Sequence, residues 1–267
     1  MNWSNYIIFA ISSIGCWLIP FIFNVKQKNV ITYSYIIGII IYSAFIAGLW
    51  YNQGYPPLKT VNDTRLWYSW FLTLIGFIIY IRWNYRWLLC FISGLSCIFI
   101  ILIIISPKAE ASTLLPVLQS IWFIPHVLSY MLSYSLLLLS TIVGYYQFYR
   151  QRKGENIKDF YVIMNNLISL GIIFLTIGLL IGMQWANEAW GSFWSWDIKE
   201  IWALITLLTY LFIFHYRLYA HNNLVTLLLL SCGLLFFMIT WLGIKYLPNT
   251  DSMHLYSYID AFSKNCT

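Results

Sequence analysis

The chain reads LISLGIIFLTIGLLIGMQW from Leu167 to Trp185, nineteen residues without a charged side chain. A helix needs about 20 mostly apolar residues to cross the roughly 30 Å of hydrocarbon in a bilayer. The whole chain has the same character, since 61% of its 267 residues are hydrophobic and only 9% are charged. Soluble domains carry about 25% charged residues. The sequence therefore predicts an α-helical membrane protein.

Seven further stretches resemble this one in length and hydrophobicity. We therefore expect an all-α, polytopic helical bundle with about eight transmembrane helices. Besides Leu167 to Trp185, the predicted spans are Trp3 to Phe23, Val30 to Tyr51, Leu66 to Ile81, Trp87 to Ser106, Ile121 to Tyr149, Ile198 to Leu218 and Leu224 to Tyr246. The third span along the chain, Leu66 to Ile81, is short, and the fifth, Ile121 to Tyr149, is over-long.

The basic residues predict how the bundle is oriented, because cytoplasmic loops collect Lys and Arg. With the N-terminus outside, nine of the fifteen basic residues fall on the inner side, and Arg150 to Lys158 is the densest basic loop. Both termini are then expected outside. The net charge of +6 is explained by these scattered loop charges, so we expect no nucleic-acid partner. Met1 to Tyr6 lacks the basic residue that precedes the apolar run of a cleaved signal peptide, so we expect the first span to be kept as a transmembrane helix.

The two halves of the chain differ in their chemistry. All four histidines and the densest group of tryptophans lie after residue 120. We therefore predict that residues 1–115 form a four-span scaffold or partner-docking region. Residues 116–267 would form the functional core.

The richest aromatic segment lies between the sixth and seventh predicted spans, at residues 185–202. It holds five tryptophans and Phe193, with Gly191, Ser192 and Ser195 among them. An interfacial aromatic belt would account for one or two tryptophans at each span end. Small residues let a flat ligand approach the backbone, and aromatic faces pack well against a large π system. The segment is interpreted as an external loop that forms a platform for such a ligand.

Asp197 has a second, purely structural interpretation. Asp at a helix start followed three residues later by Glu200 is the capping-box pattern. Asp197 is thus expected to begin the seventh span, whether or not it also touches a ligand.

The segment Trp190-Gly-Ser-Phe-Trp-Ser-Trp-Asp-Ile-Lys-Glu-Ile-Trp202 resembles the WWD signature of haem-handling cytochrome c assembly proteins. It is most similar to the CcsA (ResC-like) branch, although Ile198 stands where that family usually has Pro. Two further stretches resemble the segments around the family's external histidines. They are residues 118–127, with His126, and residues 242–258, with His254 in an altered Leu-His-Ser-Tyr. The resemblance covers roughly residues 115–260.

The resemblance implies a set of haem-binding residues. His126 and His254 would be the axial iron ligands, and the topology independently places both on the side of the Trp-rich segment. Lys199 would pair with a haem propionate, although a lysine beside a membrane is also explained by snorkelling. The residues expected to contact haem b are Trp185, Trp190, Gly191, Trp194, Trp196, Asp197, Lys199, Trp202 and His215.

His215 is expected to serve a different site from the outer pair. Counted from Ile198 it lies about 26 Å along the seventh span, at roughly 1.5 Å per residue, near the cytoplasmic leaflet. It matches the family's intramembrane histidine, whose partner belongs to a CcsB-like (ResB-like) membrane subunit. His221, in the short inner turn, is interpreted as a solvated loop residue.

The implied function is delivery of haem, held as transported substrate, to apocytochrome c outside the membrane. There the haem vinyl groups would form thioethers with the Cys-x-x-Cys-His thiols of the substrate. The sequence offers no nucleophile or acid–base pair, so the chain would act as a synthase subunit by positioning haem. The alternatives are a CcmC-like exporter that passes haem to a chaperone and a structural subunit in membrane lipid. We expect a bacterial cytoplasmic membrane rather than a thylakoid, because no transit peptide is visible.

Overall fold

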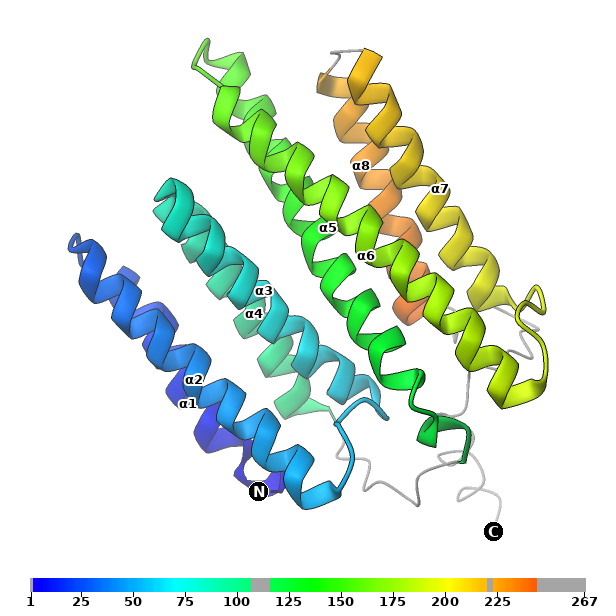
Figure 1. Ribbon diagram of the computed structural model, residues 1–267. Helices are drawn as coiled ribbons and strands as arrows, with labels where there is room; N and C mark the ends of the chain where they lie inside the picture. Colours follow the sequence, from blue (N-terminus) through cyan, green and yellow to red (C-terminus); the bar gives the residue numbers. More distant parts are fainter. Residues whose placement is uncertain (1, 107–115, 220–222, 244–267) are drawn as a thin grey trace. The chain divides into compact units, whose positions relative to one another are not determined.

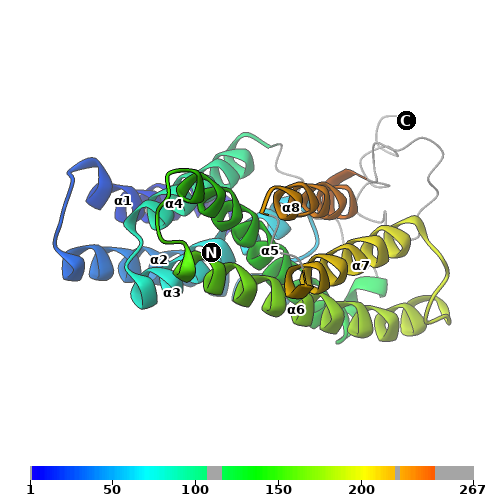
Figure 2. The same ribbon diagram turned by 90° about the horizontal axis from the view of Figure 1, so that it is seen from above.

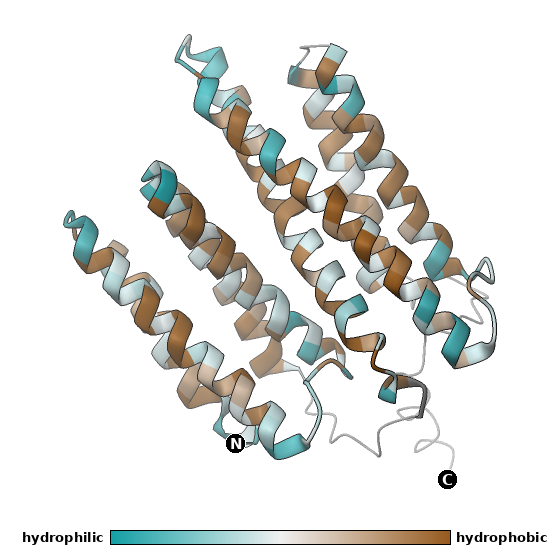
Figure 3. Ribbon diagram, viewed as in Figure 1, coloured by the Kyte–Doolittle hydropathy of each residue, from teal (hydrophilic) through white to brown (hydrophobic). Residues whose placement is uncertain are grey.

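The structure is a computed structural model that describes residues 2–106, 116–219 and 223–243. Eight helices within these residues are long and apolar enough to cross a membrane, which confirms the predicted all-α bundle of about eight spans. Hydrophilic residues gather toward the helix ends and hydrophobic residues along their middles (Figure 3). The helices are α1 (Tyr6–Ile22), α2 (Lys28–Gln53), α3 (Val61–Trp83), α4 (Arg86–Ile105), α5 (Phe123–Arg152), α6 (Lys158–Trp190), α7 (Ile198–Tyr219) and α8 (Asn223–Met238).

The helices are grouped in two compact units, Met1–Ala111 with α1 to α4 and Ser112–Thr267 with α5 to α8 (Figure 1). In each unit every helix packs against two others, in the cyclic orders α1, α2, α3, α4 and α5, α6, α7, α8. Figure 2 views both groups from above. The different roles predicted for the two parts of the chain remain a prediction.

The first unit holds buried hydroxyl groups that bond to one another. The Tyr42 hydroxyl lies 3.2 Å from that of Tyr6 and 2.8 Å from that of Ser69, and Ser69 donates to the Leu66 carbonyl. Such pairing is needed because an unsatisfied polar group in a hydrocarbon-like interior costs several kcal/mol, as an order of magnitude. The buried polar atoms thereby tie α1, α2 and α3 together.

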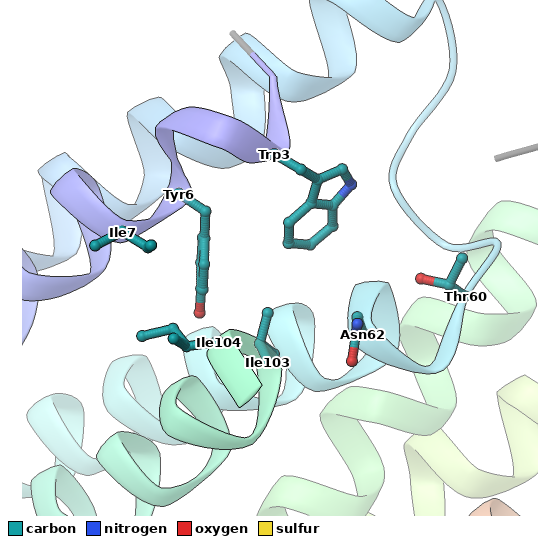
Figure 4. Close-up of a pocket in the computed structure, with 7 residues that line it drawn as sticks. All are labelled: Trp3, Tyr6, Ile7, Thr60, Asn62, Ile103 and Ile104. Carbon is teal, nitrogen blue, oxygen red and sulfur yellow. The ribbon is translucent and has the colours of Figure 1, made fainter. Parts of the chain in front are cut away.

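The third span is longer than the sixteen-residue stretch expected from hydrophobicity. A capping box begins α3, in which the Asp63 amide donates to Thr60 Oγ1 and Asp63 Oδ2 accepts from the Thr60 amide. The cap allows polar residues before Leu66 to join the helix. Beside this start lies a small pocket bordered by α1, α3 and α4, shown in Figure 4 and lined by Trp3, Tyr6, Ile7, Thr60, Asn62, Ile103 and Ile104.

The second unit is built on the long antiparallel pair α5 and α6. With 33 residues, α6 is about 50 Å long at roughly 1.5 Å per residue, which exceeds a hydrocarbon core of about 30 Å. The predicted loop 185–202 was therefore too long. Trp185 and Trp190 lie in α6, Trp202 lies in α7, and only residues 191–197 connect the two helices.

The reason for this difference lies in the residues after Trp185. Ala186 and Glu188 favour a helix, so the chain continues past the end of the apolar span. Gly191 then adopts a left-handed conformation with φ +75°, and its amide donates to the Asn187 carbonyl at 3.0 Å. This is a glycine helix end, which hydrophobicity alone does not reveal.

Candidate functional site

One end of the second unit brings together the start of α5, the end of α6, residues 191–197 and the start of α7 (Figure 1). This end carries His126 and most of the predicted aromatic contacts. By the charge distribution it is the end predicted to face outside. We call residues 191–197 the aromatic loop, because it holds Phe193, Trp194 and Trp196.

His126 lies in the first turn of α5 and is half-buried. Its Nδ1 lies 2.8 Å from the Gly178 carbonyl oxygen of α6. A carbonyl can only accept, so Nδ1 must carry the hydrogen of this bond. In a neutral imidazole the lone pair is then on Nε2, which is the form that binds a metal, while the bond at Nδ1 orients the ring.

The His126 ring is held on two sides by aromatic side chains. The Trp185 ring stacks on it, with centroids 5.6 Å apart and an interplanar angle of 23°. The Tyr130 ring meets it edge-on at 5.0 Å and 72°. Behind the imidazole, Gly182 leaves no space, because a Cβ there would lie 2.5 Å from Nδ1 and Cε1. The ring is thus wedged against α6 in one orientation.

Trp185 is only 2% exposed, so it supports His126 instead of presenting an open face. Its ring also meets Trp190 edge-on, with centroids 5.1 Å apart and an interplanar angle of 72°. The tryptophans at the end of α6 therefore form the packing beneath the histidine.

The aromatic loop presents open aromatic surface at this end. Phe193 is 52% exposed and Trp196 is 67% exposed. The Trp194 ring lies perpendicular to that of Trp196, at 89° with centroids 5.8 Å apart. Trp196 has φ +58°, a left-handed conformation that is uncommon for a bulky residue and carries backbone strain.

Glu200 holds this strained loop in place from the first turn of α7. Its buried Oε2 accepts from the amides of Ser195 at 2.9 Å and Asp197 at 3.1 Å, the residues on either side of Trp196. The Ser195 hydroxyl donates to the same carboxylate at 3.3 Å. Glu200 was expected only to help cap a helix. The spacing of Asp197 and Glu200 could predict one of these bonds, but not the bond to Ser195.

The remaining predicted residues lie at the start of α7. Asp197 is buried and directly precedes the first residue of that helix, where a capping residue was expected. Lys199 is half-buried in the first turn. Trp202 packs toward α8, with its ring 5.9 Å from that of Phe236. These three residues therefore lie where the aromatic loop passes into α7.

His215 lies elsewhere in the unit. It is seventeen residues after Ile198, so it is about 26 Å from the start of α7. Its side chain is exposed on the surface of the unit. His215 is therefore not brought together with His126, as expected. His254 and His221 lie outside the described residues.

Comparison with known proteins relates the chain to proteins of cytochrome c assembly. A family model described as "Cytochrome C assembly protein" matches residues 8–250. The chain is also similar to proteins named cytochrome c biogenesis protein CcsA. The Guillardia theta protein is 29% identical, with 97% of each chain covered. The Solanum tuberosum protein is 33% identical over 79% of this chain and 82% of the relative. The Atropa belladonna protein is 35% identical over 67% of this chain and 72% of the relative.

Proposed function

Because this chain belongs to the cytochrome c assembly protein family, we propose that it is the haem-handling, CcsA-type subunit of a cytochrome c synthase. The observation that carries the proposal is His126, whose Nδ1 donates to the Gly178 carbonyl while its ring is packed between Trp185 and Tyr130. A histidine oriented through one nitrogen is prepared to bind a metal through the other. Haem is then the transported substrate of this chain.

The aromatic loop supplies the surface that a porphyrin needs. Trp194 and Trp196 offer large aromatic faces, and Gly191 lacks a side chain that would keep a flat ligand away. Glu200 holds the loop before the ligand arrives, so less ordering entropy is lost on binding. We propose that His126 and His254 are the two axial ligands and that Lys199 pairs with a propionate.

The chain contributes positioning to the attachment reaction. Each thioether forms when a thiol of the substrate's Cys-x-x-Cys-His segment adds across a haem vinyl group. Orienting reactants in this way can contribute several kcal/mol, as an order of magnitude, without a covalent intermediate on the protein. We propose that the haem edge carrying the vinyl groups is presented outward, where apocytochrome c docks.

The inner site requires a second subunit. An imidazole such as that of His215 is costly to leave in lipid, and it lies on an exposed part of α7. We propose that a CcsB-like (ResB-like) chain covers His215 and supplies the second ligand for haem b arriving from the inner side. We propose a bacterial cytoplasmic membrane as the location, with a thylakoid membrane as the alternative.

The ligand assignment is tested by replacing His126 and His254 by alanine, one at a time. The complex with its partner subunit is purified, and haem content and the optical spectrum are measured before and after adding imidazole. Each variant is expected to lose haem at the outer site and to recover its spectrum with imidazole, which replaces the missing ligand. His221→Ala is the control and should resemble the wild type. An unchanged spectrum and haem content in both ligand variants would refute the assignment.

A further inference from the structure

Arg217, near the end of α7, is a buried cation in the second unit. Its side chain is only 4% exposed. Nε donates to Asn165 Oδ1 of α6 at 2.8 Å, and the guanidinium lies 4.7 Å from the centroid of the Tyr161 ring. The Tyr161 hydroxyl donates to the backbone carbonyl of Arg217 at 3.4 Å. The side chain is thus held between α6 and α7 by a neutral amide and an aromatic ring.

The positive charge of Arg217 is not balanced within the described part of the chain. Its Nη2 is buried and has no hydrogen-bond partner among residues 2–106, 116–219 and 223–243. The ion pair found in those residues joins Arg150 and Glu155, not Arg217. Arginine stays charged in proteins, and a buried charge without a counter-ion is strongly destabilising. Within the described residues, no anion accepts from Nη2.

The surroundings indicate what kind of anion could arrive. The end of the unit that holds Arg217 also holds the basic turn between α5 and α6, with Arg152, Lys153 and Lys158. These charges attract anions to this end. Asn165 and Tyr161 are only half-buried, so the guanidinium is bordered by groups that a ligand can reach.

The helices beside Arg217 also carry exposed apolar side chains. Val162 follows Tyr161 on α6 and is 43% exposed, and Leu218 follows Arg217 on α7 and is 56% exposed. Exposed apolar surface therefore lies one residue along the chain from both Tyr161 and Arg217. This arrangement suits an amphiphile, with an apolar body and one oxyanion.

We propose that Arg217, Asn165 and Tyr161 form a binding site for the oxyanion of an amphiphilic ligand, either a carboxylate or a phosphate. The guanidinium would donate from Nη2 to the oxyanion, and Asn165 keeps Nε engaged so that the fork stays oriented. Two sources carry this chemistry in a membrane, a porphyrin propionate and the phosphate of an anionic lipid. The site does not depend on the function proposed above.

The oxyanion site is distinct from the iron site proposed at His215. Residues two apart on an α-helix are separated by about 200° around its axis. Accordingly, His215 is exposed while Arg217 is buried against α6. If the haem-handling proposal is refuted, the oxyanion site can still be tested. If the oxyanion site is refuted, the haem-handling proposal is unaffected.

The test uses the purified full chain in detergent, with thermal unfolding and titration as readouts. One pair of probes is protoporphyrin IX and its dimethyl ester, which differ in the free carboxylates and contain no iron. The second pair is phosphatidylglycerol and phosphatidylcholine, which differ in net charge. In the wild type, the anionic member of at least one pair should bind roughly tenfold or more tightly than the member without a net charge, as for a lost charge-assisted bond.

Arg217→Met should abolish that preference, and Arg217→Lys should keep part of it. Arg152→Met, which removes an exposed cation from the same end, is the control and should lose far less of the preference than Arg217→Met does. A preference within the porphyrin pair identifies a propionate, and one within the lipid pair identifies an anionic lipid, because both lipids carry a phosphate and only phosphatidylglycerol has a net charge. Absence of any preference in the wild type overturns the proposal without requiring a variant to fold. A preference that survives Arg217→Met in folded protein also overturns it, and Arg217 then only links α6 to α7. For the porphyrin pair both proteins carry Lys199→Met, because Lys199 is itself proposed to pair with a propionate.

Discussion

Gly182→Ala is the sharpest test of how His126 is held. The new Cβ would lie 2.5 Å from His126 Nδ1 and Cε1, where ordinary contacts are 3.4–4 Å. The imidazole must therefore retreat by about 1 Å, which stretches the 2.8 Å bond to Gly178 beyond the usual limit of about 3.2 Å. Losing a hydrogen bond that orients a metal-binding histidine typically weakens metal binding by about 10-fold to 100-fold.

The same substitution makes two opposing contributions to folding stability. Alanine is favoured over glycine within a helix by about 0.8–1 kcal/mol, whereas the lost hydrogen bond costs about 0.5–1.5 kcal/mol. These effects nearly cancel, so the melting temperature should change little while haem affinity falls. Gly94→Ala in α4 is the matched control, because no atom lies within 4 Å of a Cβ there.

The assay is a haem titration of purified protein carrying His215→Ala, so that the outer site is observed alone. Optical spectra report the ligation of iron, and dilution reports how long haem is retained. We expect weaker binding for Gly182→Ala, recovery on adding imidazole, and wild-type behaviour for Gly94→Ala. Wild-type haem affinity in Gly182→Ala would refute the argument that the Gly178 bond orients His126.

Three further outcomes are expected. Glu200→Gln removes a carboxylate that accepts from the amides of Ser195 and Asp197, so we expect a loss of about 2–4 kcal/mol in the local stability of the loop. Hydrogen exchange across residues 191–197 should therefore become faster, and unchanged exchange would contradict this role of Glu200. Trp196→Gly relieves the strain of a left-handed backbone conformation, about 1–2 kcal/mol, but removes an aromatic face. The melting temperature should therefore stay the same or rise while haem retention falls. A fall in both measurements would argue against backbone strain at this residue. His215→Ala should lower haem loading in cells while the outer site still accepts supplied haem, and normal loading would remove its transit role.

The membrane fold could be predicted from the sequence because lipid imposes a condition that each span must meet locally. A stretch such as residues 167–185 is apolar over the length that crosses a bilayer, whatever its neighbours are. The helix ends depend on a second kind of local signal. Capping by Thr60 and Asp63 and the left-handed Gly191 moved the ends of α3 and α6 beyond the apolar stretches.

The candidate site was predictable as a set of residues but not as an arrangement. Hydrophobicity, charge counting and the Trp-rich segment already indicated His126 and an aromatic surface at one end of the bundle. The roles of individual tryptophans depended on packing between helices. Trp185 proved to be buried against His126, whereas Trp196 is exposed on the loop.

The sequence by itself determined which residue types are present, how many spans they form and which histidines each end can offer. Only the tertiary structure decided that Nδ1 of His126 donates to Gly178, which is 52 residues away. It also decided that Arg217 lies buried against Asn165 without a balancing charge in the described residues. The physical reason is that the free energy of inserting a span into lipid is a sum over residues that are neighbours in the chain. Hydrogen bonds and ring contacts depend instead on which helices pack together.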